Sequence, residues 1–505
     1  MNMDPISGIT KWLLHNRVRA IGRYNKEYEK IQRNTLEHLL KKAARTEWGR
    51  RYGFAGLESY EQFAAAVPIT RYDNYRDDMV RIMNGARDVI WPGQIPYVAL
   101  SSGTTSDKSK FLPVTRECLR LSHLRGGRDV TASYLANNPD ARVATGCSLA
   151  LSGSLSDEFT TKYVKAGTIS SIMGANIPPF FRRLLRFLPP KEINDIRDAH
   201  EKFDAVARYA MTKNVTSIGG APSWMLAVIN RMLEFSGKKY LDEIWPNLEL
   251  FALGGMGFEP YRPIYEQLIR SPRMHYVLTY NASEGFFGVQ TDPSEQSLTL
   301  MLDYGNFFEF IPMSVYGTPE EKAVPLWEVE PGVEYSLVIS TTAGLWRYDI
   351  CDIIRFTGKE PYRFVITGRT HQTLNCCGEK FSVEIAEKGL AWVCEKTGAQ
   401  AEEFTVAPEW IGDDGHVRHQ WLVEFQREPE SLEEFAALLD KRIKETCGDY
   451  SDKRSGDTPL LPLSLIKARP GLFHDWLSSK GKYGGQHKVP RVSADRKHMD
   501  ELLRG

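Results

Sequence analysis

A run of hydroxyl-bearing residues near position 101 has the composition of a phosphate-binding loop. Hydroxyl groups and backbone N–H groups can donate to a polyphosphate, glycine lets the chain approach it closely, and a lysine adds positive charge. The GxxxxGK[ST] pattern of a Walker loop is absent, and an ordinary solvated turn explains this segment equally well when it is taken alone. The run consists of Ser101, Ser102, Gly103, Thr104 and Thr105, and Lys110 follows it.

A second candidate follows the apolar segment 274–278. Tyr280 can stack on a purine at the end of a strand, and Glu284 is a hard oxygen ligand that can hold Mg²⁺ between phosphates. The carboxyl end of a parallel strand is also where open α/β sheets bind ligands. Taken alone, the segment is better explained as a hairpin corner in which Ser283 and Glu284 are capping residues.

A third candidate is Asp352, which stands before the apolar pair Ile353-Ile354. A carboxylate at such a turn can accept hydrogen bonds from both hydroxyls of a ribose. Arg347 can pair with Asp349 or with a phosphate. Taken alone, a surface Arg–Asp pair is the better interpretation, because such pairs are commonplace.

Three glycine-rich segments complete the set. The backbone of Gly255 and Met256 can face an adenine after a strand, although a tight turn is an equal alternative. Arg369, which is counted among the nucleotide-binding residues, begins a junction between residues 368 and 380 that suits a hinge. In the tail at 480–491, a lysine on a mobile loop can reach a reacting carboxylate, but a solvated basic end is the simpler explanation.

Composition limits the classes of protein to which the chain can belong. Its 505 residues include 64 Lys+Arg and 64 Asp+Glu, so the formal net charge is zero, and this argues against a nucleic-acid partner. No apolar run approaches the length of about 20 residues that spans a bilayer, so we expect no membrane association. Seven scattered cysteines and an N-terminus without a secretory pattern predict a reducing, cytoplasmic location.

The elements that must position these residues predict an α/β fold of two domains. Helices are expected at 19–45 and 115–136. Strands at 148–151, 215–218, 248–253 and 274–280 alternate with helices at 192–212, 223–234 and 260–269, and a β-rich stretch covers 286–367. After it come a helix at 383–397, strands at 404–407 and 417–425, and a helix at 431–445. We therefore expect mixed β-sheets flanked by helices in residues 1–370, and a smaller, mobile α+β domain in residues 371–505.

The order of these motifs resembles that of the adenylate-forming superfamily, and more closely that of the Gretchen Hagen three family of acyl acid amido synthetases, in a bacterial-type member. The family's nucleotide motif SSGTSxGxxK is matched from Ser101 to Lys110, although Ser106 and Asp107 stand where glycine is usual. Its YxxSE motif is matched by Tyr280, Ser283 and Glu284. The resemblance covers nearly the whole chain.

The third family motif, YRxGD, is matched less well. Asp349 replaces its arginine and Cys351 replaces its glycine, while Asp352 keeps the ribose-binding position. A β-carbon disfavours the positive φ that glycine permits, so the shape of this turn is open. The run ending in Arg491 looks like the family's QYKxPR, which makes Lys488 the expected catalytic lysine, with Lys480 and Lys482 as competitors.

The resemblance implies a function as an ATP-dependent ligase that uses Mg²⁺. A small carboxylic acid would be adenylated with release of pyrophosphate, and an amino acid would then take the acyl group as an amide. Lys110, Lys488 and Mg²⁺ on Glu284 are the expected cations. Segments 119–130 and 152–181 are expected to form the acyl pocket, and Arg125 or Arg128 to orient the substrate carboxylate. The protein is expected to be a monomer or a weak oligomer.

Two alternatives remain open at this point. An acyl-CoA ligase would share the first half-reaction and use a thiol as the acceptor. A non-catalytic nucleotide-binding relative is the other possibility, and the replacements at Asp349 and Cys351 give it some weight.

Overall fold

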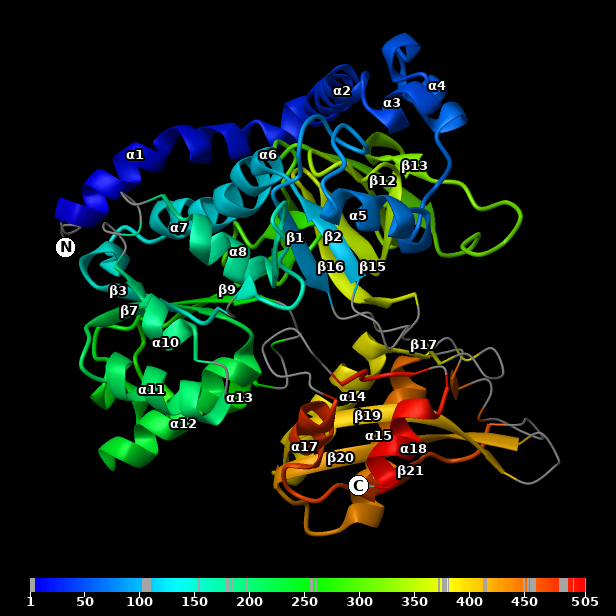
Figure 1. Cartoon of the computed structure of the whole chain (residues 1–505). Coiled ribbons are helices and arrows are strands. Elements are labelled where there is room, and N and C mark those ends of the chain that lie inside the picture. Colours follow the sequence, from blue (N-terminus) through cyan, green and yellow to red (C-terminus); the bar gives the residue numbers. More distant parts are fainter. Residues whose placement is uncertain are drawn as a thin grey trace. The chain divides into compact units, whose positions relative to one another are not determined.

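The chain folds as two structural units, each of which is described by itself. The first comprises Met1–Met256, Ile264–Ile350 and Ile354–Val365, and the second comprises Gly257–Pro263, Cys351–Ile353 and Ile366–Gly505. Short pieces of the earlier chain thus group with the second unit, and a boundary between residues 370 and 371 stays a prediction. The computed structural model describes residues 5–101, 110–152, 155–178, 182, 186–196, 199–254, 258, 261–370, 373–374, 379, 381–411, 416–447, 450–451, 454, 460–480, 489–493 and 495–504 (Figure 1).

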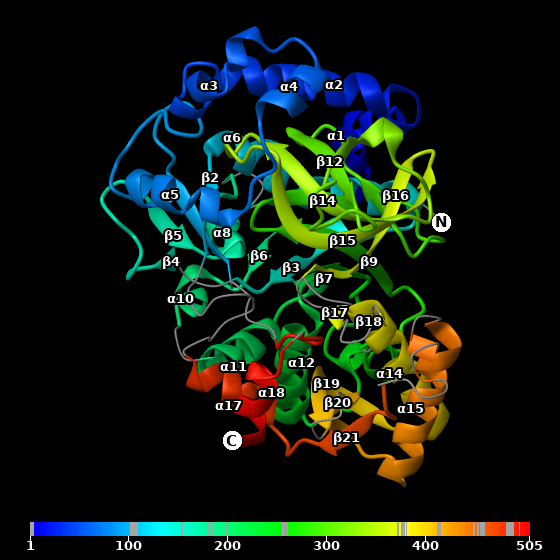
Figure 2. The ribbon, with the colours of Figure 1, turned by 90° about the vertical axis from the view of Figure 1, so that its right-hand side faces the viewer.

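One half of the main sheet is parallel, as the alternation of strands and helices predicts. Neighbouring strands run parallel from β6 through β3, β7 and β8 to β9. The strands are β3 (Cys147–Ala150), β6 (Phe187–Leu188), β7 (Val215–Gly220), β8 (Leu250–Gly254) and β9 (His275–Ala282). The connecting helices are α10 (Lys191–Asn194), α11 (Ala199–Ala210), α12 (Pro222–Ser236) and α13 (Arg262–Leu268), and α11 and α12 lie side by side (Figures 1 and 2).

The other half of the same sheet continues from β9 and consists of strands β10 to β16. β9 and β10 pair antiparallel, as do β10 with β11, β11 with β16, and β12 with both β13 and β14. Its strands are β10 (Gly285–Val289), β11 (Leu298–Leu300), β12 (Asn306–Pro312), β13 (Val324–Pro325), β14 (Glu334–Thr341), β15 (Tyr348–Lys359) and β16 (Tyr362–Arg369). The expected α/β class and the β-rich stretch are both confirmed.

A smaller sheet carries the hydroxyl-rich segment. β1 (Tyr97–Ser101) pairs antiparallel with β2 (Lys110–Val114) and parallel with β5 (Lys165–Gly167), and β5 pairs with β4 (Leu155–Ser156). The Thr115 side chain then caps the next helix by accepting from the backbone N–H of Cys118. The expected helix at 115–136 is confirmed as three consecutive pieces, α6 (Arg116–Cys118), the π-helical turn η3 (Leu119–His123) and α7 (Leu124–Asn137).

Helices from the start of the chain cover the first unit. The expected helix is α2 (Tyr24–Ala43), which buries Leu36, Leu39 and Leu40 and packs against β12 and β14 (Figure 2). Before it lies α1 (Pro5–Gly22), which packs on α7. The buried residues of α1 are Ser7, Thr10 and Leu14, so an apolar period could not reveal it. The remaining helices here are α3 (Glu47–Arg51), α4 (Tyr60–Ala66), α5 (Arg76–Met83) and α8 (Ile169–Asn176).

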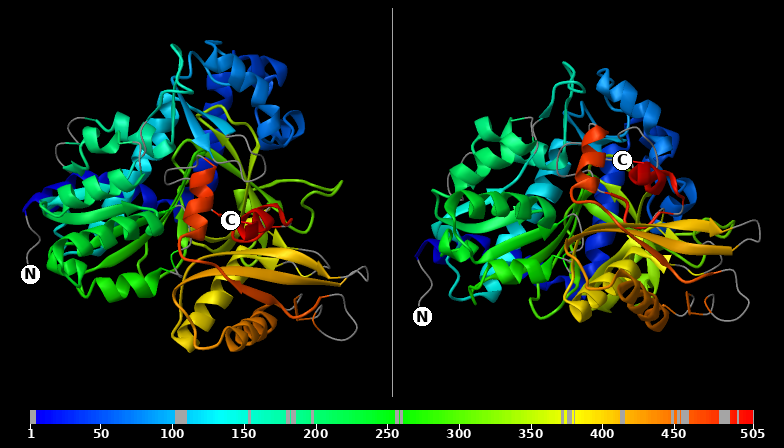
Figure 3. Two further views of the ribbon diagram at one scale, coloured as in Figure 1. Left: turned by 60° about the horizontal axis from the view of Figure 1, so that its bottom comes forward. Right: turned by 90° about the horizontal axis from the view of Figure 1, so that it is seen from below.

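The second unit has a sheet covered by helices on both faces (Figure 3). Successive residues of a strand point to opposite faces, and Val406 and Trp421 accordingly belong to one core while Ala407 and Leu422 belong to the other. The first core lies under α14 (Val383–Thr397) and α15 (Leu432–Thr446), and the second under α17 (Leu472–Ser479) and α18 (Lys497–Arg504). The strands are β19 (Gln400–Ile411), β20 (His416–Arg427) and β21 (Ser464–Lys467), and β17 (Thr373–Leu374) pairs with β18 (Phe381–Ser382).

Within the described ranges, none of the helices combines the length and the apolar character needed to cross a bilayer.

Candidate active site

The strand pair β1–β2 holds the two ends of the predicted phosphate-binding loop together. Ser101 lies directly opposite Lys110 in the antiparallel register. The ammonium group of Lys110 lies 5.7 Å from the ring centroid of Tyr72, whose hydroxyl accepts from the backbone N–H of Phe111 at 2.8 Å. The predicted ligands between the two strands lie outside the described residues, and they are Ser102, Gly103, Thr104 and Thr105.

The Tyr280–Gly285 motif forms the turn between β9 and β10. Ala282 pairs with Gly285, so Ser283 and Glu284 are the two turn residues, as the hairpin interpretation predicts. Ser283 is buried and Glu284 is half-buried. Tyr280 is buried, and its ring packs edge-on against Phe287 at a centroid distance of 5.1 Å. Its stacking on adenine stays a prediction.

The glycine-rich exit of β8 lies beside this motif. Gly254, the last residue of β8, pairs with Thr279 of β9, so the chain leaves β8 next to Tyr280. A β-carbon at Gly254 would lie 2.8 Å from the Thr279 hydroxyl, which explains why glycine stands there. β8 and β9 run parallel, so their carboxyl ends lie at the same edge of the sheet, which is the edge where ligands bind in such sheets. Gly255 and Met256 themselves lie outside the described residues.

Two residues predicted to bind the nucleotide form an ion pair within the second unit. The Nε atom of Arg369 lies 2.8 Å from Oδ1 of Asp352, and the Asp352 side chain is almost completely buried. Cys351, just before it, has φ +65°, so the left-handed turn survives the replacement of glycine. This conformation costs a residue with a β-carbon of the order of 1 kcal/mol.

The expectation for Arg347 and Asp349 is wrong, because both are buried and they have different partners. Arg347 binds Glu309 at 2.8 Å from Nη2 to Oε1, and its Nη1 donates to the carbonyls of Ala64 and Val67 at 2.7 Å each. Asp349 accepts from the hydroxyls of Ser336 at 2.7 Å and Tyr316 at 2.9 Å, and lies 3.3 Å from Nε of Arg71. Charges are rarely buried unless paired, so these two residues hold the strands in place.

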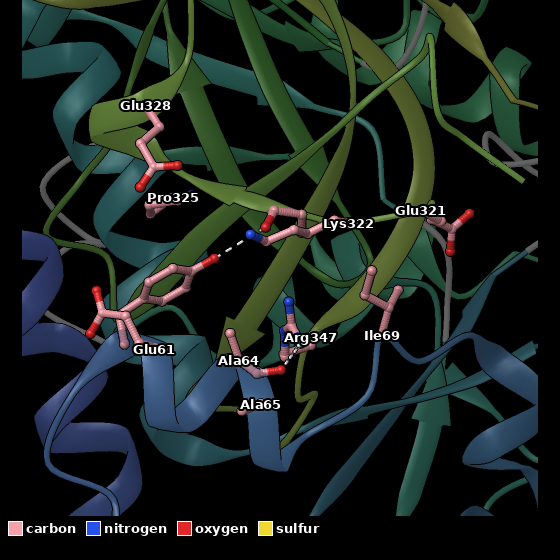
Figure 4. Close-up of a pocket in the computed structure, with 11 residues that line it drawn as sticks. Glu61, Ala64, Ala65, Ile69, Glu321, Lys322, Pro325, Glu328 and Arg347 are labelled. Carbon is pink, nitrogen blue, oxygen red and sulfur yellow. Dashed lines mark hydrogen bonds between the residues drawn. The ribbon is translucent and has the colours of Figure 1, made fainter. Parts of the chain in front are cut away.

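Arg347 also borders a cavity of about 640 Å³ between α4 and β13 (Figure 4). Tyr60 lines the cavity, and its hydroxyl donates to the carbonyl of Ala323 at 3.2 Å. The other residues that line it are Glu61, Ala64, Ala65, Ile69, Glu321, Lys322, Pro325 and Glu328. The polar groups of Arg347 and Tyr60 are engaged with protein atoms.

The two arginines expected to orient the acyl substrate lie on α7 next to a buried charge network. Arg125 donates to the carbonyl of Asp303 at 2.7 Å, and its burial lowers the pKa of the guanidinium. Nε of Arg128 lies 3.5 Å from Oδ1 of Asp129, which is fully buried. Asp129 is also paired with Arg17 at 2.6 Å. Whether Arg125 or Arg128 reaches a substrate stays a prediction.

The two segments expected to line the acyl pocket meet at the β9–β10 turn, and this contact was not predicted from the sequence. His123, at the end of η3, is fully buried, and its Nδ1 lies 2.8 Å from Oδ1 of Asn281. Nδ2 of Asn281 lies 3.5 Å from the thioether sulfur of Met173, in α8. Residues from segments 119–130 and 152–181 thus converge on one asparagine of the Tyr280–Gly285 motif.

The chain that follows the expected catalytic lysine is fixed to β19. The carbonyl of Arg491 accepts from the N–H of Val406 at 2.9 Å, and the N–H of Ser493 donates to the carbonyl of Val406 at 2.9 Å. The Arg491 side chain is buried between Glu387, with which it forms an ion pair, and Glu403 at 3.4 Å. A short motif in the sequence could have suggested this anchor, since Arg491 ends the run that carries Lys488.

Of the C-terminal lysines that could serve catalysis, Lys480 lies among the described residues. Lys480 forms an ion pair with Glu501 at 2.5 Å and lies 4.7 Å from the ring centroid of Trp476. It is therefore engaged within the second unit. Lys482 and Lys488 lie outside the described residues.

Comparison with known families accounts for most of the chain. The model of the GH3 family N-terminal domain matches residues 17–203 and 169–274, that of the GH3 family central domain matches 299–369, and that of the GH3 family C-terminal domain matches 384–497. These matches follow the order in which the sequence motifs occur.

Two curated relatives and one solved structure are similar over almost the full length. The indole-3-acetic acid-amido synthetase GH3.3 of Arabidopsis thaliana is 25% identical over 94% of this chain and 91% of its own. The 4-substituted benzoates-glutamate ligase GH3.12 of Arabidopsis thaliana is 25% identical over 94% of each. A structure of the AtGH3.15 acyl acid amido synthetase in complex with 2,4-DB superposes with a TM-score of 0.80 at 20% identity, covering 96% of this chain and 95% of that one. These relatives are plant proteins, so the expectation of a bacterial-type member stays a prediction.

Proposed function

Because the chain belongs to the GH3 family, we propose that it is an acyl acid amido synthetase, which uses ATP to join a small carboxylic acid to an amino acid. The single observation that supports this most strongly is the match of three successive family models between residues 17 and 497. One curated relative is named as an amido synthetase and another as a ligase that joins benzoates to glutamate, and this favours an amine over a thiol as the acceptor.

In the first step, an oxygen of the acid attacks the α-phosphorus of ATP, the bond to pyrophosphate breaks, and an acyl adenylate forms. The carboxylate of the acid and the triphosphate of ATP are both anions and must approach each other, so the site needs cations and N–H donors. We assign the triphosphate to the loop between Ser101 and Lys110, because β1 and β2 hold its two ends side by side. Tyr280, Gly255 and Met256 would face the adenine, and Ser283 would support their turn.

The ribose is assigned to Asp352, with Arg369 as its neighbour. A carboxylate accepts hydrogen bonds from two adjacent hydroxyls, and the ion pair with Arg369 at 2.8 Å orients the Asp352 side chain. Arg369 can rotate toward a phosphate, since its side chain is exposed.

Glu284 is the residue that would hold Mg²⁺. Mg²⁺ in nucleotide sites is usually bound by one or two carboxylates together with phosphates and waters. Among the described residues, no three His, Cys, Asp or Glu side chains come together as a metal site, so a half-buried carboxylate at a turn fits this shared mode of binding. When bound, the ion would neutralise charge that develops on the phosphates.

In the second step, the amine nitrogen attacks the acyl carbon, the bond to AMP breaks, and the ammonium proton leaves to solvent. We infer that Lys488 serves the adenylation step and that the second unit turns about the junction near residues 368–380 between the two steps. The anchoring of residues 489–493 on β19 supports this role, because it lets the whole unit carry the lysine.

The test is an ATP-dependent hydroxamate assay over a panel of carboxylic acids, followed by amide formation with amino acids in place of hydroxylamine. We expect pyrophosphate release that depends on the acid, and an amide product. Product formation with coenzyme A but not with amino acids would favour the acyl-CoA ligase. Absence of acid-dependent ATP/pyrophosphate exchange with every acid would overturn the proposal.

A further inference from the structure

His123 occupies a special position in the helix that runs from Arg116 to Asn137. It is the last residue of the π-helical turn η3. Such turns are uncommon inside α-helices, and those that occur are often found at functional sites. The residue before it, Ser122, accepts from the backbone N–H of Phe286 at 2.8 Å. The turn thereby fixes His123 against the strand pair that carries the Tyr280–Gly285 motif.

The hydrogen bonds around Asn281 determine which nitrogen of His123 carries the proton. A thioether sulfur can accept but cannot donate, so the amide nitrogen of Asn281 must be the atom that faces Met173. The amide oxygen then faces His123, and because an amide oxygen only accepts, Nδ1 of the imidazole must donate to it. Burial lowers the pKa of His123 to about 4, although the bond to Asn281 acts in the opposite direction. The ring is therefore neutral at pH 7, and Nε2 presents a lone pair.

That lone pair is buried and has no hydrogen-bond partner among the residues that the structure describes. An unsatisfied buried acceptor is costly, and native proteins rarely keep one without a water or a ligand that donates to it. The imidazole belongs to one of the two segments that the family resemblance assigns to the acyl pocket, 119–130, and it shares Asn281 with Met173 of the other, 152–181. A donor supplied by the bound acid would satisfy this atom.

We propose that Nε2 of His123 accepts a hydrogen bond from a hydroxyl or N–H group on the acyl acid, so that the enzyme selects acids that carry such a donor. This inference rests on the proposed function and specifies its substrate class. A site that hydrogen-bonds its substrate discriminates against an analogue without the donor, because the protein group is then left unpaired in the complex.

Matched pairs of acids test the selection directly. Suitable pairs are indole-3-acetic acid with 1-benzothiophene-3-acetic acid, in which sulfur replaces the ring N–H, and 4-hydroxybenzoate with 4-methylbenzoate. For the wild type we expect kcat/KM in the hydroxamate assay to favour the donor-bearing acid of at least one pair by roughly tenfold, which corresponds to about 1.4 kcal/mol. In His123→Leu this ratio should fall to about one, because the donor is no longer satisfied.

Two further variants separate the role of the acceptor from general effects on packing. Asn281→Asp is nearly isosteric, but its carboxylate favours the protonated imidazole, so Nε2 becomes a donor and the preference should be lost or reversed. His275→Leu makes the same substitution at the first residue of β9, where Nδ1 of His275 lies 3.4 Å from the hydroxyl of Tyr134 in α7. Its preference should equal that of the wild type. Equilibrium binding of the same acids, measured by calorimetry, provides a readout that is independent of turnover.

The outcomes distinguish the inference from the function on which it rests. Acid-dependent adenylation with equal kcat/KM for the two acids of each pair would overturn the inference alone. It would indicate that a buried water, and not the acid, donates to Nε2. A ratio that persists in His123→Leu would also overturn it. Absence of adenylation with all acids would overturn the proposed function and the inference together.

Discussion

Arg369 and Asp352 hold each other, with 2.8 Å between Nε and Oδ1, although the sequence assigns both to the nucleotide. A buried carboxylate that is paired in this way keeps its orientation before any ligand arrives. Preorganisation of this kind lowers the cost of binding. The pair is therefore expected to govern affinity for ATP more than the rate of the chemical steps.

We expect Arg369→Ala to raise the KM for ATP by about twofold to fivefold, since the loss of an ion pair with a partly exposed arginine is worth roughly 0.5–1 kcal/mol. Arg369→Lys should recover part of the loss, because it keeps the charge but not the planar geometry. The measurement is ATP/pyrophosphate exchange as a function of ATP concentration. A lower KM would show that Arg369 instead competes with the ribose for Asp352, and an unchanged KM would show that the pair does not affect ATP binding.

The buried pair of Arg347 and Glu309 gives a prediction on stability. Glu309→Ala leaves a buried guanidinium without its counter-ion and should cost about 3–5 kcal/mol of unfolding free energy. Lys41→Ala, which breaks an exposed pair with Glu37 on α2, should cost less than about 1 kcal/mol. Urea unfolding followed by tryptophan fluorescence compares the two variants.

The double variant Glu309→Leu with Arg347→Met is the matching control. Replacing both charges by apolar groups of similar volume removes the unpaired charge, so it should recover a large part of the stability. Equal losses in Glu309→Ala and Lys41→Ala would contradict the structural role that we assign to Arg347.

His123 makes the stability of the first unit depend on pH. Its pKa is about 4 in the folded chain and near 6.5 in an unfolded chain, so the unfolded chain binds more protons between these values. The contribution of this group is complete above roughly pH 6.5 and is lost as the pH falls through 4, with a limit of roughly 3 kcal/mol.

The expected observation is that the stability of the wild type relative to His123→Leu decreases from pH 7 to pH 4.5. Urea unfolding at a series of pH values measures it, and all other titrating groups are common to both proteins. A difference that does not change with pH would mean that folding leaves the pKa of His123 unchanged.

Arg491 should act as a positioning residue for the expected catalytic lysine. Arg491→Ala removes the ion pair with Glu387, and should lower kcat for adenylation by about tenfold or more with little change in the KM for ATP, since a small displacement of a catalytic group is costly. Arg491→Lys should restore part of the rate. Lys488→Ala sets the limit expected for complete loss of the lysine.

Arg454→Ala provides a control in the same unit. Arg454 pairs at 2.8 Å with Asp440 of α15, whereas residues 491–493 are fixed to β19. Its loss should reduce stability while kcat per folded molecule stays near the wild-type value. An equal fall in kcat for Arg454→Ala and Arg491→Ala would attribute both effects to general destabilisation.

Local patterns were enough to predict most of the elements. α12, α14 and α15 follow from apolar spacing, and the β8 and β9 strands follow from short apolar runs that end in glycine or polar residues. The turn formed by Ser283 and Glu284 was likewise predictable, because both residues suit a tight corner between two apolar strands.

Long-range partners were not predictable. The partner of Arg347 is Glu309, thirty-eight positions earlier in the chain, and only the order of strands in the sheet brings the two together. His123 was missed for a related reason, since one π-helical turn changes which side of the helix faces the sheet. Burial of charged and polar side chains thus depends on tertiary structure that a single sequence does not display.

The direct pairing of Ser101 with Lys110 places the two ends of the predicted phosphate-binding segment on neighbouring strands. Its two anchor points are set by strand hydrogen bonds, so changes in the length or composition of the intervening segment need not disturb any other strand. Substitutions such as Ser106 and Asp107, which stand where the family usually has glycine, can accordingly be tolerated as local variation. Grafting the corresponding loop of a relative between the same two anchors is therefore a practical route to re-engineering how the enzyme holds its nucleotide.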